Sequence, residues 1–596
     1  MAEKKEMKIA EVKGRPMLHW IGKQPLETVK SFPSQLVEKF NIDEAPQVPT
    51  FESLKNNWTN LLFHGDNKEV LSTLLVNGFR GKIDLIYIDP PFDSGADYIR
   101  KVELRGQKDK IEGEEPSLIE QVQYTDIWAN DNYLQFMYER LILLRELLSD
   151  KGSIYLHCDW HKNHHLRFLL DEVFNEENFI NEIAWCYTGP TNQKNNYPRK
   201  HDTILLYKKS DDYIFNSDEI RVAFKKSTKS GGKNALTGRA SDEELEALDE
   251  KGKIIEDWWI DIADLGKLHN EDLKYPTQKS TPLLERIIKA SSNDNSIVLD
   301  CFSGSGTAAA VAQKLGRKWI ACDINKGAIQ TTSKRLQNVI KEQIKEIVKE
   351  KSKLDLDEKK TFFTSFAHYK INDYDLQIQH NELKLLVYEH IGVKKLATDS
   401  FFDGTLGAEL VKIIPFNHPL SLLDLQLVKT ELEKRKDETR NIVLVSLGME
   451  VKVKTAIDDY NKLRPVNKIR TIELRTDKKY GSFFVHKPAQ AEVEISKVKD
   501  KGKVIIKDFI SPTIIQRLNI DSKLFQAQIK DFRSQIDVVL IDTDYNGEVF
   551  NICISDVPEK KKDFVKGEYE FAIKNKDLKI AVKIIDMLGE EVLIIE

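Results

Sequence analysis

The residues best suited to chemistry are Asp89, Pro90, Pro91 and Phe92, which are consecutive in the chain. A carboxylate and a backbone carbonyl can both accept hydrogen bonds from one planar amino group. The two prolines hold such a carbonyl rigidly because they fix φ. Phe92 offers a flat face on which a ring can stack. Together these residues could hold an amino nitrogen with its lone pair directed at an electrophile.

A predicted strand positions this group. Residues 83–88 form an apolar run of strand length, and Asp89 follows it directly. The group is therefore expected at the carboxyl edge of a parallel sheet, which is where open α/β folds bind their ligands.

A second group combines a strand, a glycine-rich turn and a helix. Residues 296–302 read as a buried strand, Gly304 and Gly306 follow, and residues 308–315 favour a helix. This arrangement lets a nucleotide-like ligand approach the backbone. The next strand ends at Asp323, whose carboxylate can accept hydrogen bonds from a ribose hydroxyl pair. Because the third glycine of the dinucleotide fingerprint is absent, the pattern favours a smaller adenosyl ligand over NAD.

Both groups resemble motifs of one enzyme family. LDCFSGSGT, at residues 299–307, resembles the S-adenosylmethionine motif of amino-methyltransferases that act on DNA, and DPPF resembles their catalytic motif. The catalytic motif comes first, which is the order of the β group of DNA adenine-N6 and cytosine-N4 methyltransferases. Five further stretches resemble the modification subunits of Type III restriction systems: IDPPFDSGADY (88–98), YTDIW (124–128), GSIYLHCDW (152–160), RKHDTILL (199–206) and YPTQK (275–279). The resemblance covers about residues 58–340.

The resemblance implies an α/β fold and a set of site residues. The expected fold is a Rossmann-like, S-adenosylmethionine-dependent methyltransferase domain with an inserted target-recognition region, followed by a mixed α/β part and a β-rich C-terminal part. The catalytic residues would be Asp89, Pro90, Pro91 and Phe92. The cofactor-binding residues would be Asp66, Thr277, Lys279, Asp300, Phe302, Ser303, Gly304, Gly306 and Asp323.

Two of these assignments have alternatives. Asp66 is also placed to be the N-cap of a helix that begins near Lys68. Lys279 could be a surface lysine, and Ser280 stands where the family commonly has proline.

The implied reaction is methyl transfer from S-adenosylmethionine to the N6 amino group of an adenine flipped out of duplex DNA. Adenine is favoured because Asp at the first catalytic position is commoner among adenine enzymes, whereas Ser is commoner among cytosine-N4 enzymes. Cytosine-N4 methylation stays open, and so does a role as the DNA-recognition subunit of a restriction complex with a nuclease-helicase partner. The chain itself has no GxxxxGK[ST] element.

The DNA contacts are predicted in a basic loop. Residues 222–240 contain basic side chains and glycines but no acid, and they lie inside the predicted target-recognition region, residues 186–275. A solvated loop is the alternative reading. The predicted DNA-binding residues are Lys225, Lys226, Lys229, Lys233 and Arg239.

No metal is expected. The five cysteines are scattered without a CxxC pair. The histidine cluster at 157–165 offers His161 and His165 as one plausible helical pair for a metal, but a structural or surface role is favoured.

The 596 residues predict several domains. We expect an N-terminal arm (1–50), a catalytic domain (51–345), a charged connector (346–364), a mixed α/β region (365–500) and a small β-rich domain (501–596). There is no apolar run of membrane-span length and no signal-peptide core at the start, so a cytoplasmic protein is expected. Double-stranded DNA is the predicted partner, with a homodimer and a restriction subunit left open.

Overall fold

The computed structural model describes residues 6–10, 14, 17–20, 23–91, 97–103, 105, 118–125, 132–189, 194–222, 252–263, 278–351, 363–371, 387–396, 399, 401–414, 420–446, 448–449, 451–463, 466–474, 488–498, 500–517, 531–558, 563–573 and 577–596.

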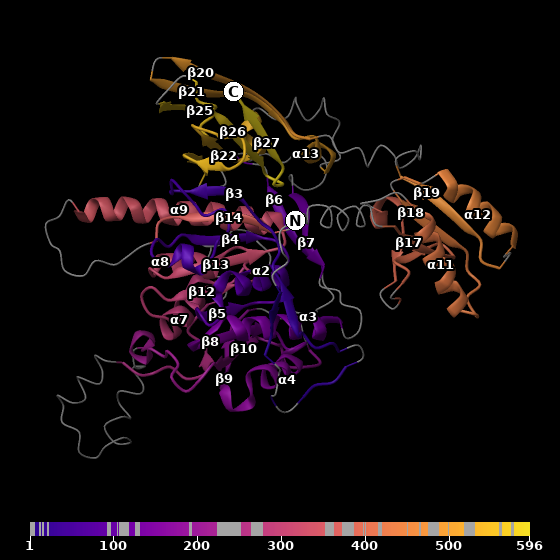
Figure 1. Ribbon diagram of the computed structural model, residues 1–596, viewed down its shortest axis with the longest axis horizontal. Coiled ribbons are helices and arrows are strands. Elements are labelled where there is room, and N and C mark those ends of the chain that lie inside the picture. Colours follow the sequence, from indigo (N-terminus) through magenta and orange to yellow (C-terminus); the bar gives the residue numbers. More distant parts are fainter. Residues whose placement is uncertain are drawn as a thin grey trace.

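The main sheet has eleven strands, of which six central ones are parallel (Figure 1). In spatial order these are β8 (Leu148–Cys158), β5 (Ile83–Ile88), β12 (Ile297–Asp300), β13 (Lys318–Asp323), β4 (Asn60–His64) and β14 (Phe366–Ile371). Beside β8 lie β10 (His201–Lys208), β9 (Phe179–Cys186) and β11 (Trp258–Trp259). Beside β14 lie β3 (Ser34–Phe40) and β23 (Phe550–Ile552).

Helices cover both faces of this sheet, and alternating residues of each central strand pack against opposite layers. In β5, Ile86 and Ile88 face one core and Leu85 and Tyr87 face the other. The first core contains residues of α2 (Asn67–Leu74), α3 (Asn132–Leu147) and α4 (Asn163–Phe174). The second contains residues of α7 (Thr281–Ser291), α8 (Thr307–Lys314) and α9 (Lys326–Lys351). Burial on both faces explains the continuous apolar runs, and the predicted α/β fold class is confirmed.

A separate α/β module follows in the chain. Its five-stranded sheet contains β15 (Lys394–Lys395), β16 (Gly404–Leu406), β17 (Glu409–Ile413), β18 (Ile442–Ser446) and β19 (Ile469–Glu473). It also contains α11 (Leu422–Lys434) and α12 (Val451–Leu463), and it has cores of its own.

The last hundred residues form two further sheets that share one core. One sheet contains β20 (Gln490–Val498), β21 (Lys501–Ile510) and β25 (Glu568–Ala572). The other contains β24 (Ile554–Asp556), β22 (Ile536–Asp542), β26 (Ala581–Asp586) and β27 (Glu591–Ile595). The remaining short elements are β1 (Glu6–Lys8), β2 (Thr28–Lys30), α1 (Phe51–Leu54), β6 (Asp97–Glu103), β7 (Leu118–Thr125) and α13 (Pro512–Arg517).

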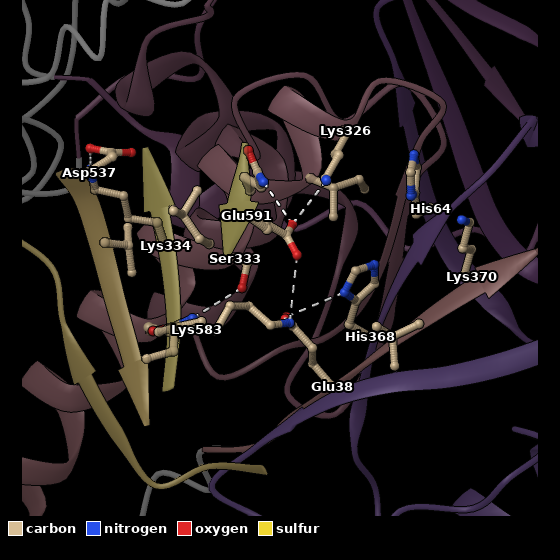
Figure 2. Close-up of a pocket in the computed structure, with 17 residues that line it drawn as sticks. Glu38, His64, Lys326, Ser333, Lys334, His368, Lys370, Asp537, Lys583 and Glu591 are labelled. Carbon is tan, nitrogen blue, oxygen red and sulfur yellow. Dashed lines mark hydrogen bonds and ion pairs between the residues drawn. The ribbon is translucent and has the colours of Figure 1, made fainter. Parts of the chain in front are cut away.

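The β-rich C-terminal part is joined to the methyltransferase-like sheet by a strand and by charged groups. β23 pairs in parallel with β3, so a C-terminal segment forms the outer edge of the main sheet. Next to it a cavity of about 160 Å³ lies between α9 and the C-terminal strands (Figure 2). On its wall the Lys583 ammonium contacts the Glu38 carboxylate, and both side chains are buried. Lys326 at the start of α9 pairs with Glu591 at 3.3 Å.

Three segments lie in different units from those that the sequence predicted. β3 belongs to the expected N-terminal arm and β14 to the expected region 365–500, yet both strands pair within the main sheet. α9 continues to residue 351, into the expected connector. The physical reason is that a strand finds its partners across the sheet, and local sequence does not specify long-range pairing. Among the described helices, none is long and apolar enough to cross a membrane.

Candidate active site

Asp89 lies at the carboxyl end of β5, as the sequence predicted, and it is held by Lys279. The Lys279 Nζ donates to Asp89 Oδ2 at 2.5 Å, and the two side chains are 10% and 15% exposed. The other carboxylate oxygen, Asp89 Oδ1, is buried and has no hydrogen-bond partner among the described residues. Pro90 is buried and Pro91 half-buried, whereas Phe92 lies outside the described part of the chain. The arrangement leaves one oxygen of the Asp89 carboxylate at the sheet edge without a partner from the described residues.

A hydrogen-bonded network of polar side chains runs from β5 across the neighbouring strands. The Tyr87 hydroxyl lies 2.9 Å from His157 Nδ1, and His157 Nε2 lies 3.2 Å from Asp202 Oδ2. The Tyr187 hydroxyl donates to Asp202 Oδ1 at 3.1 Å. Burial alone would raise the pKa of Asp202, but the hydrogen bond and charge of His157, with the charge of Lys279, lower it. We did not predict this hydrogen-bonded network, although His157 and Asp202 lie in two of the motifs that carry the resemblance.

The glycine turn adopts a conformation that requires glycine. Gly304 and Gly306 have φ of 48° and 71°, in the left-handed region. A Cβ on Gly306 would lie 2.6 Å from the Thr332 side chain. The Thr332 hydroxyl donates to the Gly304 carbonyl at 3.1 Å, so α9 holds the turn from one side. The Ser303 Oγ is buried and unpartnered among the described groups.

Two carboxylates flank this turn, those of buried Asp300 and half-buried Asp323. The backbone N–H of Gly304 donates to Asp323 Oδ2 at 2.8 Å, and that of Phe302 donates to Asp300 Oδ1 at 3.0 Å. Burial raises the pKa of Asp323 to about 6. Burial, with the nearby charges of Asp89 and Asp323, raises the pKa of Asp300 to about 8. Such a site favours a positively charged ligand, because a cation would stabilise the ionised carboxylates.

Asp66 is the N-cap of α2, as one of the two predicted alternatives has it. Its Oδ1 accepts from the Lys68 backbone N–H at 2.8 Å. The Arg140 guanidinium also donates to both oxygens of Asp66, at 2.9 and 3.0 Å. Phe302 packs near the same place, with its ring centroid 6.1 Å from that of Phe136. The sequence contained no signal for the Arg140 contact, because the two residues come from different helical segments.

The structure brings most of the predicted residues to one edge of the main sheet. Asp89, Asp300 and Asp323 follow or end the adjacent strands β5, β12 and β13, and the turn with Ser303, Gly304 and Gly306 lies between the last two. Lys279 joins them from the segment before α7. The predicted residues that lie outside the described part of the chain are Phe92, Thr277, Lys225, Lys226, Lys229, Lys233 and Arg239.

The residues present fit S-adenosylmethionine. Its sulfonium and ammonium groups are cations, and the edge offers the carboxylates of buried Asp300 and half-buried Asp323. The unpartnered Ser303 Oγ can bind a polar group of such a ligand. In the part of the chain that the structure describes, no three His, Cys, Asp or Glu side chains are grouped to hold a metal ion.

Comparison with known proteins identifies the family. Residues 83–335 match the family described as DNA methylase, of N6 and N4 type, and residues 278–419 match that of D12 class N6 adenine-specific DNA methyltransferases. The Type II methyltransferase M.EcaI of Enterobacter cloacae is 29% identical over 46% of this chain and 69% of its own. M1.MboII of Moraxella bovis, also a Type II methyltransferase, is 32% identical over 33% of this chain and 76% of its own.

A Type III relative is matched over a smaller share of its length. The StyLTI Mod subunit of Salmonella typhimurium is 27% identical over 46% of this chain, which spans about half (54%) of that relative. The predicted family and its adenine-specific DNA methyltransferase activity are thus confirmed at the level of the family. The chain belongs to the N6/N4 family of DNA methylases.

Proposed function

We propose that this protein methylates the N6 amino group of a specific adenine in duplex DNA, with Asp89 as the acceptor that orients this amino group. The observation that carries the proposal is Asp89 Oδ1, which is buried and has no partner among the described residues, at the end of the strand next to the positive-φ glycine turn. The match to the D12 class of N6 adenine-specific enzymes favours adenine over cytosine.

Bound S-adenosylmethionine supplies an electrophilic methyl group. Asp323 and the turn at Gly304 and Gly306 bind its adenosine part, and Asp300 and Ser303 lie beside them. Asp66, Phe302 and Thr277 complete the proposed cofactor contacts, with Lys279 at the junction with the catalytic residues. Holding the methyl group and the amino nitrogen in line is the largest part of the rate acceleration.

Asp89 and the Pro90 carbonyl orient the amine. Lys279 neutralises one oxygen of Asp89, and the second oxygen accepts from the adenine amino group. As the bond between the nitrogen and the methyl carbon forms, the bond between that carbon and sulfur breaks, and S-adenosylhomocysteine leaves. Positive charge grows on the nitrogen, the carboxylate stabilises that charge, and the nitrogen then loses one proton to solvent. Pro91 keeps the segment rigid, and Phe92 provides the face on which the flipped base stacks. The predicted recognition region 186–275, with its basic loop, selects the site on DNA.

The test is transfer of a tritiated methyl group to unmethylated genomic DNA, followed by nucleoside analysis. We expect the label in N6-methyladenine. In Asp89→Ala and Asp89→Asn the rate should fall by about a hundredfold or more, because the carboxylate charge acts in the transition state, while cofactor affinity stays near wild type. Label in N4-methylcytosine would overturn the base, and no label on any DNA, with cofactor bound, would overturn the function.

The similarity to the StyLTI Mod subunit supports a second proposal. We infer that the protein works in a restriction-modification system in the cytoplasm, where a nuclease-helicase subunit binds it. Tagged protein isolated from its native cells should then carry a larger partner with a nucleotide-hydrolysis motif. Isolation of the chain alone or only as a homodimer, with full methylation activity, would contradict this inference.

A further inference from the structure

An exposed tryptophan stands next to the catalytic strand. Trp160 lies two residues beyond the end of β8, and β8 pairs with β5 so that Leu156 is level with Ile88, the residue before Asp89. Trp160 therefore lies past the same carboxyl edge as Asp89, one strand away. Its side chain is 44% exposed. Large aromatic side chains usually gain their stability from burial, so a half-exposed indole beside a catalytic edge indicates a contact surface.

The indole is held in place although the core does not bury it. The Arg199 guanidinium stacks on the ring at 3.6 Å from its centroid, and the His161 ring lies 3.8 Å away at 31°. His161 is fixed in turn by Asp159, which contacts its Nδ1 at 2.5 Å and accepts its backbone N–H at 2.9 Å. Arg199 lies two residues before β10, the antiparallel neighbour of β8, in which Thr203 is level with Cys158. Two segments far apart in sequence thus build one rigid stack.

The surroundings of this stack are basic and aromatic. Residues 194–201, which precede and begin β10, contain Lys194, Arg199 and Lys200 but no acid. Tyr197 in the same segment is 95% exposed. Cations that neutralise phosphates, interleaved with aromatic faces on which bases stack, are the combination that binds nucleic acid.

The geometry points to the Trp160–Arg199 stack as a DNA-contacting subsite at the rim of the active site. The indole presents apolar surface to a nucleobase exposed when the target leaves the helix, and the guanidinium binds the adjacent phosphate. This inference rests on the proposed function, since the subsite serves the same DNA. Trp160 lies outside the predicted recognition region 186–275, whereas Arg199 lies within that region but apart from its basic loop at 222–240.

Flipping explains why such a subsite is useful. Removing a base from the stack costs a few kcal/mol, and any surface that covers the bases left behind offsets part of that cost. A preformed stack does so with little loss of side-chain entropy, because Trp160 and Arg199 are already ordered by each other and by His161.

The experiment compares DNA binding by four variants of the full chain. The variants are Trp160→Ala, Trp160→Phe, Arg199→Ala and, as the matched control, Phe215→Ala. Phe215 is also an exposed aromatic residue, at 41%, but it follows the far end of β10, at the opposite edge of the sheet. The probe is a fluorescein-labelled restriction fragment of unmethylated plasmid DNA, at one salt concentration, with binding followed by anisotropy. Cofactor affinity and the unfolding midpoint are measured on the same samples.

We expect the Kd for DNA to rise about tenfold to a hundredfold in Trp160→Ala, since base–aromatic stacking contributes about 1–3 kcal/mol. Trp160→Phe should keep much of the affinity, and Arg199→Ala should weaken binding and flatten its salt dependence. Phe215→Ala should match wild type, and all four variants should bind the cofactor normally.

Wild-type affinity in Trp160→Ala, or an equal loss in Phe215→Ala, would overturn the subsite. If Trp160→Ala fails to fold, the DNA affinities of Trp160→Phe and Arg199→Ala are compared instead. Only Arg199→Ala should then show a lower affinity and a weaker salt dependence, and equal affinities would overturn the subsite. A failure of the proposed function gives another result. Wild type would then bind the fragment without methylating any DNA, and the DNA affinity of Trp160→Ala could still be compared with that of wild type.

Discussion

Lys279 is the cation around which the carboxylates of the site are arranged. It contacts Asp89, and its charge also acts on Asp202 and Asp300. Among the described residues of this site, the carboxylates of Asp89, Asp300 and Asp323 outnumber the Lys279 ammonium. The pKa of Asp300 is raised to about 8, because this side chain is buried and lies near other carboxylates. At this scale the site is prepared for a cation before any ligand arrives.

Binding of S-adenosylmethionine should therefore release protons near neutral pH. The bound cation lowers the pKa of Asp300 below its value of about 8 in the free protein, so affinity rises with pH and levels off above pH 8. Isothermal titration calorimetry at pH 7 in two buffers of different ionisation enthalpy measures the protons released. Asp300→Asn should lose this release, while the cofactor's own amino group titrates alike in both proteins. Equal apparent enthalpies for wild type in the two buffers would contradict the assignment.

The glycine turn shows how one element depends on another. The Gly304 N–H donates to the Asp323 carboxylate, and the Gly304 carbonyl accepts from the Thr332 hydroxyl of α9. The Arg335 guanidinium, one turn further along α9, donates to Thr307 Oγ1 at 2.8 Å. Hydrogen bonds with β13 and α9 together therefore hold the glycine turn and the start of α8.

Gly306→Ala should weaken cofactor binding about tenfold or more. An alanine there has an unfavourable φ, which costs about 1–2 kcal/mol, and its Cβ also meets Thr332 at 2.6 Å. Gly407→Ala is the control, because Gly407 has φ of 60° and open space around its Cβ position. Equilibrium dialysis with labelled cofactor and thermal unfolding give the two readouts. Equal effects in the two variants would mean that the clash with Thr332 is relieved by a small shift.

Local signals in the sequence predicted the elements of the core well. The strand predicted at 83–88 and the helix predicted at 308–315 agree with β5 and α8 within one residue. These segments combine clear apolar patterns with Pro or Gly at their ends. The contacts of Asp66 with Arg140 and of His157 with Asp202 were missed, because they join residues that only the sheet order brings together. Asp89 beside Asp300 and Asp323 was expected, since both motifs end parallel strands.

At the scale of the whole molecule, the C-terminal part is bound to the methyltransferase sheet through a buried ion pair. Burial alone would raise the pKa of Glu38, but Lys583 and His368 hold it well below its usual range. Lys583 also lies 3.8 Å from Glu591, which pairs with Lys326 at the start of α9 (Figure 2). The C-terminal part is therefore paired with α9, the helix that also donates a hydrogen bond to the glycine turn.

Lys583→Met should destabilise this junction by about 3–5 kcal/mol, because it leaves the Glu38 charge buried without its partner. The double variant with Glu38→Met should recover most of the loss. Lys55→Met is the control, since its pair with Glu52 is exposed and contributes about 0–1 kcal/mol. Hydrogen exchange of the β3 and β23 amides, with thermal unfolding, measures the effect. A double variant no better than Lys583→Met would show that apolar groups cannot replace the pair.

The pairing of β23 with β3 also determines when, during translation, β3 can gain its outer partner strand. β3 ends at residue 40, and the strand that covers its outer edge ends at residue 552. At about 5–20 residues per second, a ribosome needs about 30–100 s to make the chain between them. During that interval β3 offers unpaired backbone groups that can join a strand of another nascent chain. Chaperone capture and co-translational aggregation should therefore concentrate on chains that have not yet reached residue 552.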